Sequence, residues 1–148
     1  MRERLTLSHV GAQGDGVAEG PGGPVFVPLT LPGEVVEGEV RDGRMADFDL
    51  ISASDQRQAA PCPHFGVCGG CALQHWRDAP LLDWKAGQVR RSLARQGLEP
   101  PIHPTVAVPA GRRRRMAVHA RKGADGQVQA GGRFGMIQEG RRQGRQPG

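Results

Sequence analysis

The stretch LTLSHVGAQGDGVAEGPGGPVFVPLTLPGEVVEGEV, residues 5–40, carries the pattern that decides the fold of the 148-residue chain. Within it, LTLSHVG and EVVEGEV alternate apolar and polar residues, and GPVFVPL is a short apolar run. GAQGDGVAEGPGG and LPGE between them have turn composition, with Gly14, Gly16 and Gly20 free to adopt positive φ angles and sharp bends. Short strands at this spacing predict a small closed or nearly closed β-barrel over residues 4–52, although a generic β-meander would show the same periodicity.

The overall composition argues against a large core and against a membrane protein. Aromatic residues make up only 4% of the chain, and 23 glycines and 12 prolines interrupt it throughout. No apolar run reaches the roughly 18 residues of a membrane-spanning helix. The N-terminus, MRERLTLSHVG, lacks the long apolar core of a secretory signal. We therefore expect a cytoplasmic chain with reduced cysteines and no membrane partner.

Charge is distributed unevenly along the chain. Residues 1–83 contain 6 basic and 12 acidic side chains, a net charge of −6, whereas residues 84–148 contain 14 basic and 3 acidic side chains, a net of +11. A basic half of this strength suits a polyanion such as RNA, but it is equally compatible with a solvated arginine-rich surface.

The second informative stretch, APCPHFGVCGGCALQHW at residues 60–76, holds all the cysteines of the chain: Cys62, Cys68 and Cys71. A C-x2-C pair places two thiolates on one tight turn, and the Cys62 arm, stiffened by prolines, can bring round the third. Soft thiolates select zinc, copper(I) or iron–sulfur clusters. We therefore predict a metal site at these three cysteines, with three unligated thiols in a loop as the weaker interpretation.

The fourth ligand of such a site is open. Structural zinc accepts three cysteines and one histidine, and both His64 and His75 lie within the segment. A four-iron cluster usually takes four cysteines, and this chain has three. The composition therefore permits a complete zinc site or an incomplete iron–sulfur site.

The remaining sequence predicts one helix and one strand pair. Residues 53–61 read as a polar linker, and apolar residues from Leu81 to Leu93 recur near helical spacing, which predicts a helix over about residues 80–96 that stops at Gly97. RRRRMAVHARKG predicts a strand with one wet side, followed by an ADG turn and a partner strand from about Gln127. The end, GRRQGRQPG, reads as a disordered tail.

Taken together, these pieces resemble a known family. Residues 5–40 resemble the TRAM domain, a small OB-like β-barrel that binds RNA. PCPHFGVCGGCALQHW is similar to the iron–sulfur segment of the S-adenosylmethionine-dependent RNA (uracil-5-)-methyltransferases, which act on rRNA or tRNA. LLDWKAGQVRRSLARQG and RRRRMAVHARKGADGQV resemble the helix and the first strand pair of the central domain of that family. The resemblance runs from about residue 5 to residue 128 in the same order.

The resemblance implies a mainly β fold in five parts. A TRAM barrel is expected over residues 1–53, an iron–sulfur segment over 54–77, a helix over 78–98, an incomplete β-rich central domain over 99–136 and a disordered or aberrant tail over 137–148. In the family, a [4Fe-4S] cluster has a fourth cysteine downstream of the central strands, and this chain has no later cysteine. The sequence departs from the family near Val128, which we interpret as a frameshift or truncation.

The resemblance also implies a function. In the family, a C-terminal domain binds S-adenosylmethionine and supplies the nucleophilic cysteine and the base; neither has a counterpart here, so we predict no catalytic residue. We expect a truncated 23S-type RNA uridine-C5-methyltransferase that keeps RNA binding, with no obligate protein partner. The alternatives are a stand-alone TRAM module with a zinc or iron–sulfur knob, and an iron–sulfur redox sensor.

Basic side chains of the second half are the candidate contacts to RNA phosphates. They could instead pair with carboxylates of a catalytic domain. They are Arg112, Arg113, Arg114, Arg115, Arg121 and Lys122.

Overall fold

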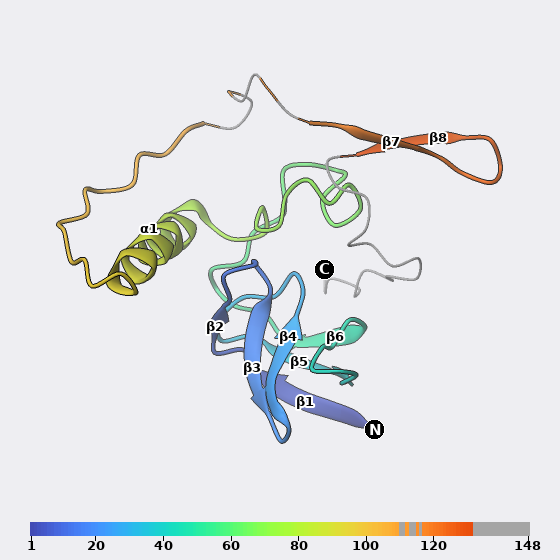
Figure 1. Ribbon diagram of the computed structural model, residues 1–148. Coiled ribbons are helices and arrows are strands. Elements are labelled where there is room, and N and C mark those ends of the chain that lie inside the picture. Colours follow the sequence, from blue (N-terminus) through green and yellow to red (C-terminus); the bar gives the residue numbers. More distant parts are fainter. Residues whose placement is uncertain (110–111, 113–114, 116, 132–148) are drawn as a thin grey trace.

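The computed structural model describes residues 1–109, 112, 115 and 117–131, and it is mainly β with one helix (Figure 1). This confirms the predicted fold class. In the described part of the chain, no helix is long and apolar enough to cross a membrane. The N-terminal strands are β1 (Arg2–Thr6), β2 (His9–Val10), β3 (Gly16–Gly20), β4 (Gly23–Val27), β5 (Val35–Glu39) and β6 (Phe48–Ser52). They are followed by α1 (Asp78–Ala94), β7 (His119–Lys122) and β8 (Val128–Gly131).

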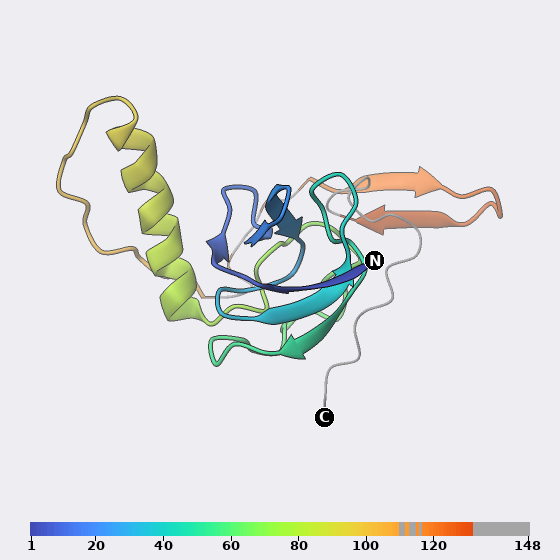
Figure 2. The ribbon, with the colours of Figure 1, turned by 90° about the horizontal axis from the view of Figure 1, so that it is seen from below.

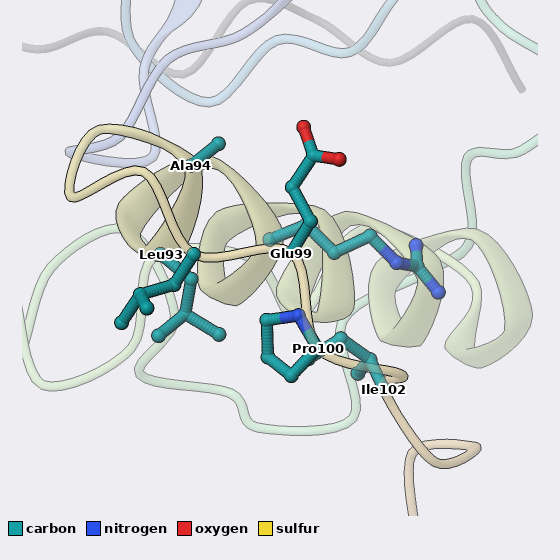
Figure 3. A pocket seen from close by; sticks show the side chains of 7 residues that line it. Leu93, Ala94, Glu99, Pro100 and Ile102 are labelled. Atoms are coloured by element: carbon teal, nitrogen blue, oxygen red, sulfur yellow. The ribbon is translucent and has the colours of Figure 1, made fainter.

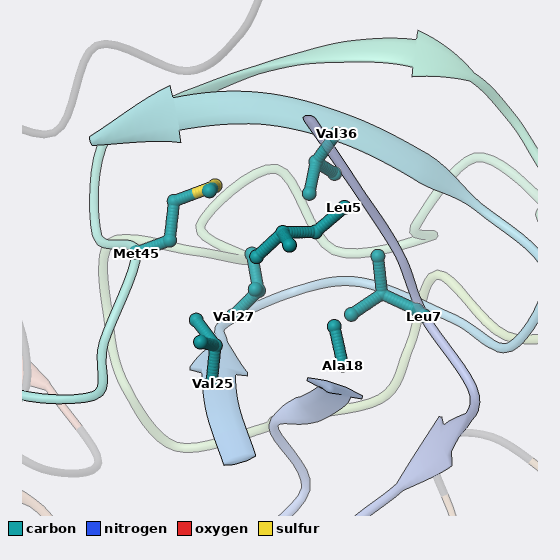
Figure 4. Close-up of a cluster of buried hydrophobic side chains, with 7 residues drawn as sticks. All are labelled: Leu5, Leu7, Ala18, Val25, Val27, Val36 and Met45. Carbon is teal, nitrogen blue, oxygen red and sulfur yellow. The ribbon is translucent and has the colours of Figure 1, made fainter. Parts of the chain in front are cut away.

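The six N-terminal strands form two antiparallel three-stranded sheets. One sheet has the order β1-β5-β6 and the other β2-β3-β4, so the described strands do not close into a single ring (Figure 2). Both sheets contribute to one apolar core, which is shown in Figure 4. That core consists of Leu5, Leu7, Ala18, Val25, Val27, Val36 and Met45. The alternation noted in the sequence is the reason, since every second residue of a strand faces inward.

One part of the turn prediction is wrong. Residues 16–20 form strand β3, and only Gly14 of the three glycines singled out has a positive φ, of 90°. A Cβ at Gly16 would lie 2.1 Å from Thr30 Oγ1, and one at Gly20 would lie 2.7 Å from Val25 Cγ2. Close packing therefore requires glycine at both positions, although neither residue has a positive φ angle.

A second apolar cluster joins strands β1–β6 and their connections (residues 2–52, the β-domain) to the cysteine segment and to α1. Val10 and Leu31 come from the β-domain, Trp76 from the cysteine segment, and Trp84 from α1. The Trp84 indole Nε1 donates a hydrogen bond of 2.9 Å to the Val10 carbonyl, and the two tryptophan rings lie 6.1 Å apart. The helix and the cysteine segment are thus docked on the β-domain by apolar burial.

Helix α1 ends at Ala94, and the turn that follows it closes at Gly97, the predicted stop. The Leu98 amide donates to the Leu93 carbonyl at 3.1 Å, and the Gly97 amide donates to the Ala94 carbonyl at 2.9 Å. Gly97 has a φ of 69°. This is the Schellman arrangement, in which a glycine in the left-handed region closes the last turn.

Strands β7 and β8 form the predicted hairpin. The expectation that only one face of the first strand is exposed to solvent is wrong for β7. All four residues of β7 are exposed, and within the described chain the hairpin packs against no other helix or strand. Strand β7 therefore buries neither of its faces in the described chain. Met116 of the predicted strand and residues 132–148, which include the predicted tail, lie outside the described residues.

Candidate functional site

The cysteine segment forms a series of tight turns between the linker and α1. The Phe65 amide donates to the Cys62 carbonyl at 3.1 Å, and the Cys68 amide donates to the His64 carbonyl at 2.9 Å. Gly66 and Gly69 have φ angles of 82° and 71°, which residues with a side chain rarely adopt. The glycines of this stretch therefore allow the backbone to wrap within a few residues.

None of the cysteines forms a disulfide. Cys71 is exposed, whereas Cys62 and Cys68 are partly buried. Among the described residues, no three side chains of the His, Cys, Asp and Glu types are gathered as a metal site. The structure places the predicted ligands on one short loop without bringing them into ligating positions, so the metal site stays a prediction.

The two histidines of the segment lie in opposite environments. His64 is exposed, whereas the His75 side chain is 3% exposed and stacks obliquely on Phe65, with ring centroids 5.4 Å apart. Neither ring nitrogen of His75 has a hydrogen-bond partner in the structure. Burial lowers the pKa of His75 to about 4, and the positive charge of Arg57 acts in the same direction, so the imidazole is neutral at pH 7.

Hydrogen bonds from the polar linker (residues 53–61) hold the C-terminal end of the cysteine loop. The Gln58 amide donates to the His75 carbonyl at 2.9 Å, and the Gln58 side-chain nitrogen donates to the Trp76 carbonyl at 3.0 Å. The Gln56 side-chain oxygen accepts the Trp76 indole hydrogen at 3.0 Å. In the loop itself, the Cys62 amide donates to Gln74 Oε1 at 3.2 Å. The two ends of the loop are therefore held side by side.

A buried ion pair attaches this linker to the β-domain. Glu34 is fully buried, and its carboxylate accepts hydrogen bonds from Arg57 Nε at 2.5 Å and from Arg57 Nη2 at 2.7 Å. The same carboxylate accepts from the backbone amides of Leu31 and Ser54. All of these contacts were missed from the sequence, because nothing in LPGE or ASDQRQAAP distinguishes these charges from surface charges.

The predicted RNA contacts are only partly described. Arg112 and Arg115 are exposed and lie in the extended chain before β7, and Arg121 and Lys122 are exposed on β7. Arg113 and Arg114 lie outside the described residues. The described basic side chains are thus presented to solvent, as phosphate contacts require.

The outer face of the β2-β3-β4 sheet carries an aromatic side chain. His9, Val17 and Phe26 lie opposite one another across the three strands, and Arg44 forms a bridge with Phe26. Phe26 is 39% exposed, which is the largest exposure of any aromatic residue in the described chain. Arg44 donates to the Asp15 carboxylate at 2.7 Å.

An apolar pocket lies at the C-terminal end of α1, where the chain folds back after Gly97 (Figure 3). It shares no residue with the cysteine segment and contains no metal-ligating cysteine or histidine. Its lining consists of Arg90, Leu93, Ala94, Leu98, Glu99, Pro100 and Ile102. It therefore adds nothing to the chemistry of the loop.

Comparison with known proteins gives the class of protein. A protein of Caulobacter vibrioides, named as an uncharacterized RNA methyltransferase, is 53% identical over 124 residues, which are 83% of this chain and 30% of that protein. The 23S rRNA (uracil(1939)-C(5))-methyltransferase of Halomonas elongata is 40% identical over 139 residues, which are 88% of this chain and 29% of that protein. The enzyme of the same name from Acidithiobacillus ferrooxidans is 37% identical over 113 residues, 68% of this chain and 26% of that protein. No family model matches the chain.

The chain belongs to the RNA methyltransferase family that includes the 23S rRNA (uracil-C5)-methyltransferases. It spans about 30% of the length of these curated relatives. The family expected from the sequence is thereby confirmed.

Proposed function

We propose that this chain is the RNA-binding part of an RNA uridine-C5-methyltransferase of the 23S rRNA type. The observation that carries the proposal is the 40% identity with the Halomonas enzyme over 88% of the chain. By the resemblance described above, methyl transfer from S-adenosylmethionine requires a further catalytic domain. We therefore assign no catalytic role to any of the described residues.

The structure supports two kinds of RNA contact. The β-domain consists of two small antiparallel sheets and exposes Phe26 on the outer face of β2-β3-β4. Such a ring can stack on a base, as aromatic residues do in OB-like proteins that bind single strands. The first half of the chain is acidic, so the phosphate contacts are assigned to Arg121 and Lys122 of the hairpin and to the described arginines before it.

The test is binding of a fluorescent 23S rRNA fragment that contains the uracil at position 1939, measured by anisotropy over a series of salt concentrations. We expect the affinity to fall with salt, because Lys and Arg release counterions from phosphate. The double variant Arg121→Ala/Lys122→Ala should reduce the slope of log K against log salt by about 1 to 2. Phe26→Ala should weaken binding by about 1–3 kcal/mol with the slope unchanged.

Two outcomes would contradict the proposal. The first is an affinity that does not change with salt, and the second is an unchanged slope and affinity in both variants. Glu3→Gln is a suitable matched control, because Glu3 lies on β1, on the other sheet. It should leave both the slope and the affinity close to those of the unmodified chain.

The second candidate is a stand-alone RNA-binding module with a metal knob. Buried His75, whose ring nitrogens have no hydrogen-bond partner in the structure, is the residue that this candidate would use as the fourth ligand. This candidate also predicts RNA binding, and it differs from the first in needing no catalytic domain.

A further inference from the structure

The arginines of the β-domain and the linker have acidic partners, whereas the basic residues of α1 do not. The five arginines of residues 1–57 each form an ion pair with a carboxylate: Arg2, Arg4, Arg41, Arg44 and Arg57. Within the described part of the chain, no ion pair is formed by the four basic residues of α1 and its C-cap: Lys85, Arg90, Arg91 and Arg95. Positive charge without a counter-charge therefore gathers on α1.

From the placement of this charge, we propose that Arg91 and Arg95 bind phosphate groups of RNA. An arginine guanidinium matches the geometry of a phosphate with two parallel hydrogen bonds. The candidate contacts predicted from the sequence all lie between residues 112 and 122, so this surface is an additional one on a different element. The inference rests on the proposed function, because it takes RNA as the polyanion that the chain binds.

Arg91 and Arg95 lie on the face by which α1 docks on the β-domain. At 3.6 residues per turn, residues 81, 84, 88, 91 and 95 follow one stripe along the helix. Leu81 and Trp84 of this stripe pack in the second apolar cluster, and Trp84 donates to the Val10 carbonyl of β2. Toward its C-terminal end, α1 extends away from the strands (Figures 1 and 2). The stripe therefore changes there from apolar and docked to basic and exposed.

The chain that follows α1 covers a different side of the helix. It forms the pocket of Figure 3 with Leu93, and Thr105 Oγ1 donates to the Leu82 carbonyl at 3.4 Å. Leu93 lies about 160° around the helix from both Arg91 and Arg95. The returning chain thus leaves these two arginines exposed on the side that looks toward β2.

The two charges follow one line along the helix. A Cβ at Gly87 would lie 3.4 Å from Arg91 Nη1, so the Arg91 guanidinium lies beside the backbone one turn nearer the docked end. Arg95 follows four residues after Arg91, about 6 Å further along the axis and on the same face. Two guanidinium groups in one line suit neighbouring phosphates of one RNA strand.

The helix dipole offers a purely structural role for the same residues. Basic side chains near the C-terminal end of a helix are stabilising, and α1 has Arg91 in its last turn and Asp78 in its first. The dipole acts on Arg90 as well, whereas an RNA strand on the face described above would not contact Arg90, which lines the pocket. The two roles therefore predict different results for substitutions on different sides of the helix.

The test compares two double variants, Arg91→Gln/Arg95→Gln and Lys85→Gln/Arg90→Gln, by anisotropy with the fluorescent 23S rRNA fragment over a series of salt concentrations. Each variant removes two positive charges and introduces a good helix former, but Lys85 and Arg90 lie on other sides of α1. We expect the first variant to reduce the slope of log K against log salt by about 1 to 2 and the second to leave it unchanged.

A second measurement needs no substitution. Phenylglyoxal modifies exposed arginines, and mass spectrometry of the unmodified chain shows which of them the RNA fragment protects. We expect RNA to protect Arg91 and Arg95 but not Arg90. This result decides the assignment even if the first double variant does not fold, which thermal unfolding followed by circular dichroism reports.

Equal slopes in the two folded double variants would overturn the proposal, and so would equal phenylglyoxal modification of Arg91 and Arg95 with and without RNA. Either result would leave this face of α1 to an acidic protein surface or to the helix dipole. If the unmodified chain binds the fragment, these results contradict only the α1 surface. A chain that does not bind the fragment contradicts the proposed function, and the α1 surface with it.

Discussion

At the scale of single residues, the polar contacts of Glu34 hold the cysteine loop on the β-domain. Its carboxylate is fully buried and accepts hydrogen bonds from Arg57 and from the backbone amides of Leu31 and Ser54. Arg57 in turn donates to the Leu29 carbonyl at 2.9 Å. A buried charge without its partner is strongly unfavourable, so each member of this pair depends on the other.

We expect Glu34→Gln to destabilise the chain by about 3–5 kcal/mol, because it leaves the largely buried Arg57 guanidinium without a counter-charge. Urea unfolding followed by circular dichroism measures this difference in the free energy of unfolding. Glu37→Gln is the matched control: Glu37 pairs with Arg4 at 2.9 Å but is partly exposed, and its loss should cost about 1 kcal/mol or less. Equal effects of the two substitutions would show that the buried pair does not stabilise the fold.

Sequence reasoning could identify the candidate ligands but could not describe their environments. The spacing of Cys62, Cys68 and Cys71 can be read from the sequence, whereas the burial of His75 beside the Phe65 ring is set by the fold. Glu34 and Arg57 are 23 residues apart and are paired only by the fold. Tertiary burial of this kind leaves no local signal in the sequence.

At the scale of elements, the strands were predictable where apolar residues alternate, and not where glycine forms the strand. β4 lies within the apolar run and β5 within an alternating run, and the ADG turn joins β7 to β8 as predicted. The composition of β3 predicts a turn, because two of its five residues are glycine. Gly16 belongs in the strand because of its close approach to Thr30, a contact that local turn chemistry does not report.

This explanation of β3 can be tested by adding a methyl group. Gly16→Ala should lower the free energy of unfolding by about 1–3 kcal/mol, because its Cβ would overlap Thr30 Oγ1, which is itself buried. Gly22→Ala is the matched control, since a Cβ there meets no atom within 4 Å. Thermal unfolding of both variants measures the difference. A Gly16 variant as stable as the control would mean that β3 tolerates a side chain at this position.

At the scale of the whole molecule, the chain combines an acidic β-domain with a strongly basic second half. The β-domain has its own core, and the cysteine segment and α1 are joined to it by the Trp76–Trp84 cluster. The hairpin β7–β8 is exposed and packs on none of these described elements. An RNA that is held by both the β-domain and the hairpin would therefore bridge two parts that contact each other little.

The most direct test of RNA binding by this chain is ultraviolet crosslinking to the 23S rRNA fragment, with the crosslinked peptides identified by mass spectrometry. We expect crosslinks at Phe26 on the outer face of β2-β3-β4 and in the peptide that contains Arg121 and Lys122. Both should disappear when an excess of the unlabelled fragment is added. Crosslinks that avoid both regions would contradict the proposal that this chain is the RNA-binding part of a uridine methyltransferase.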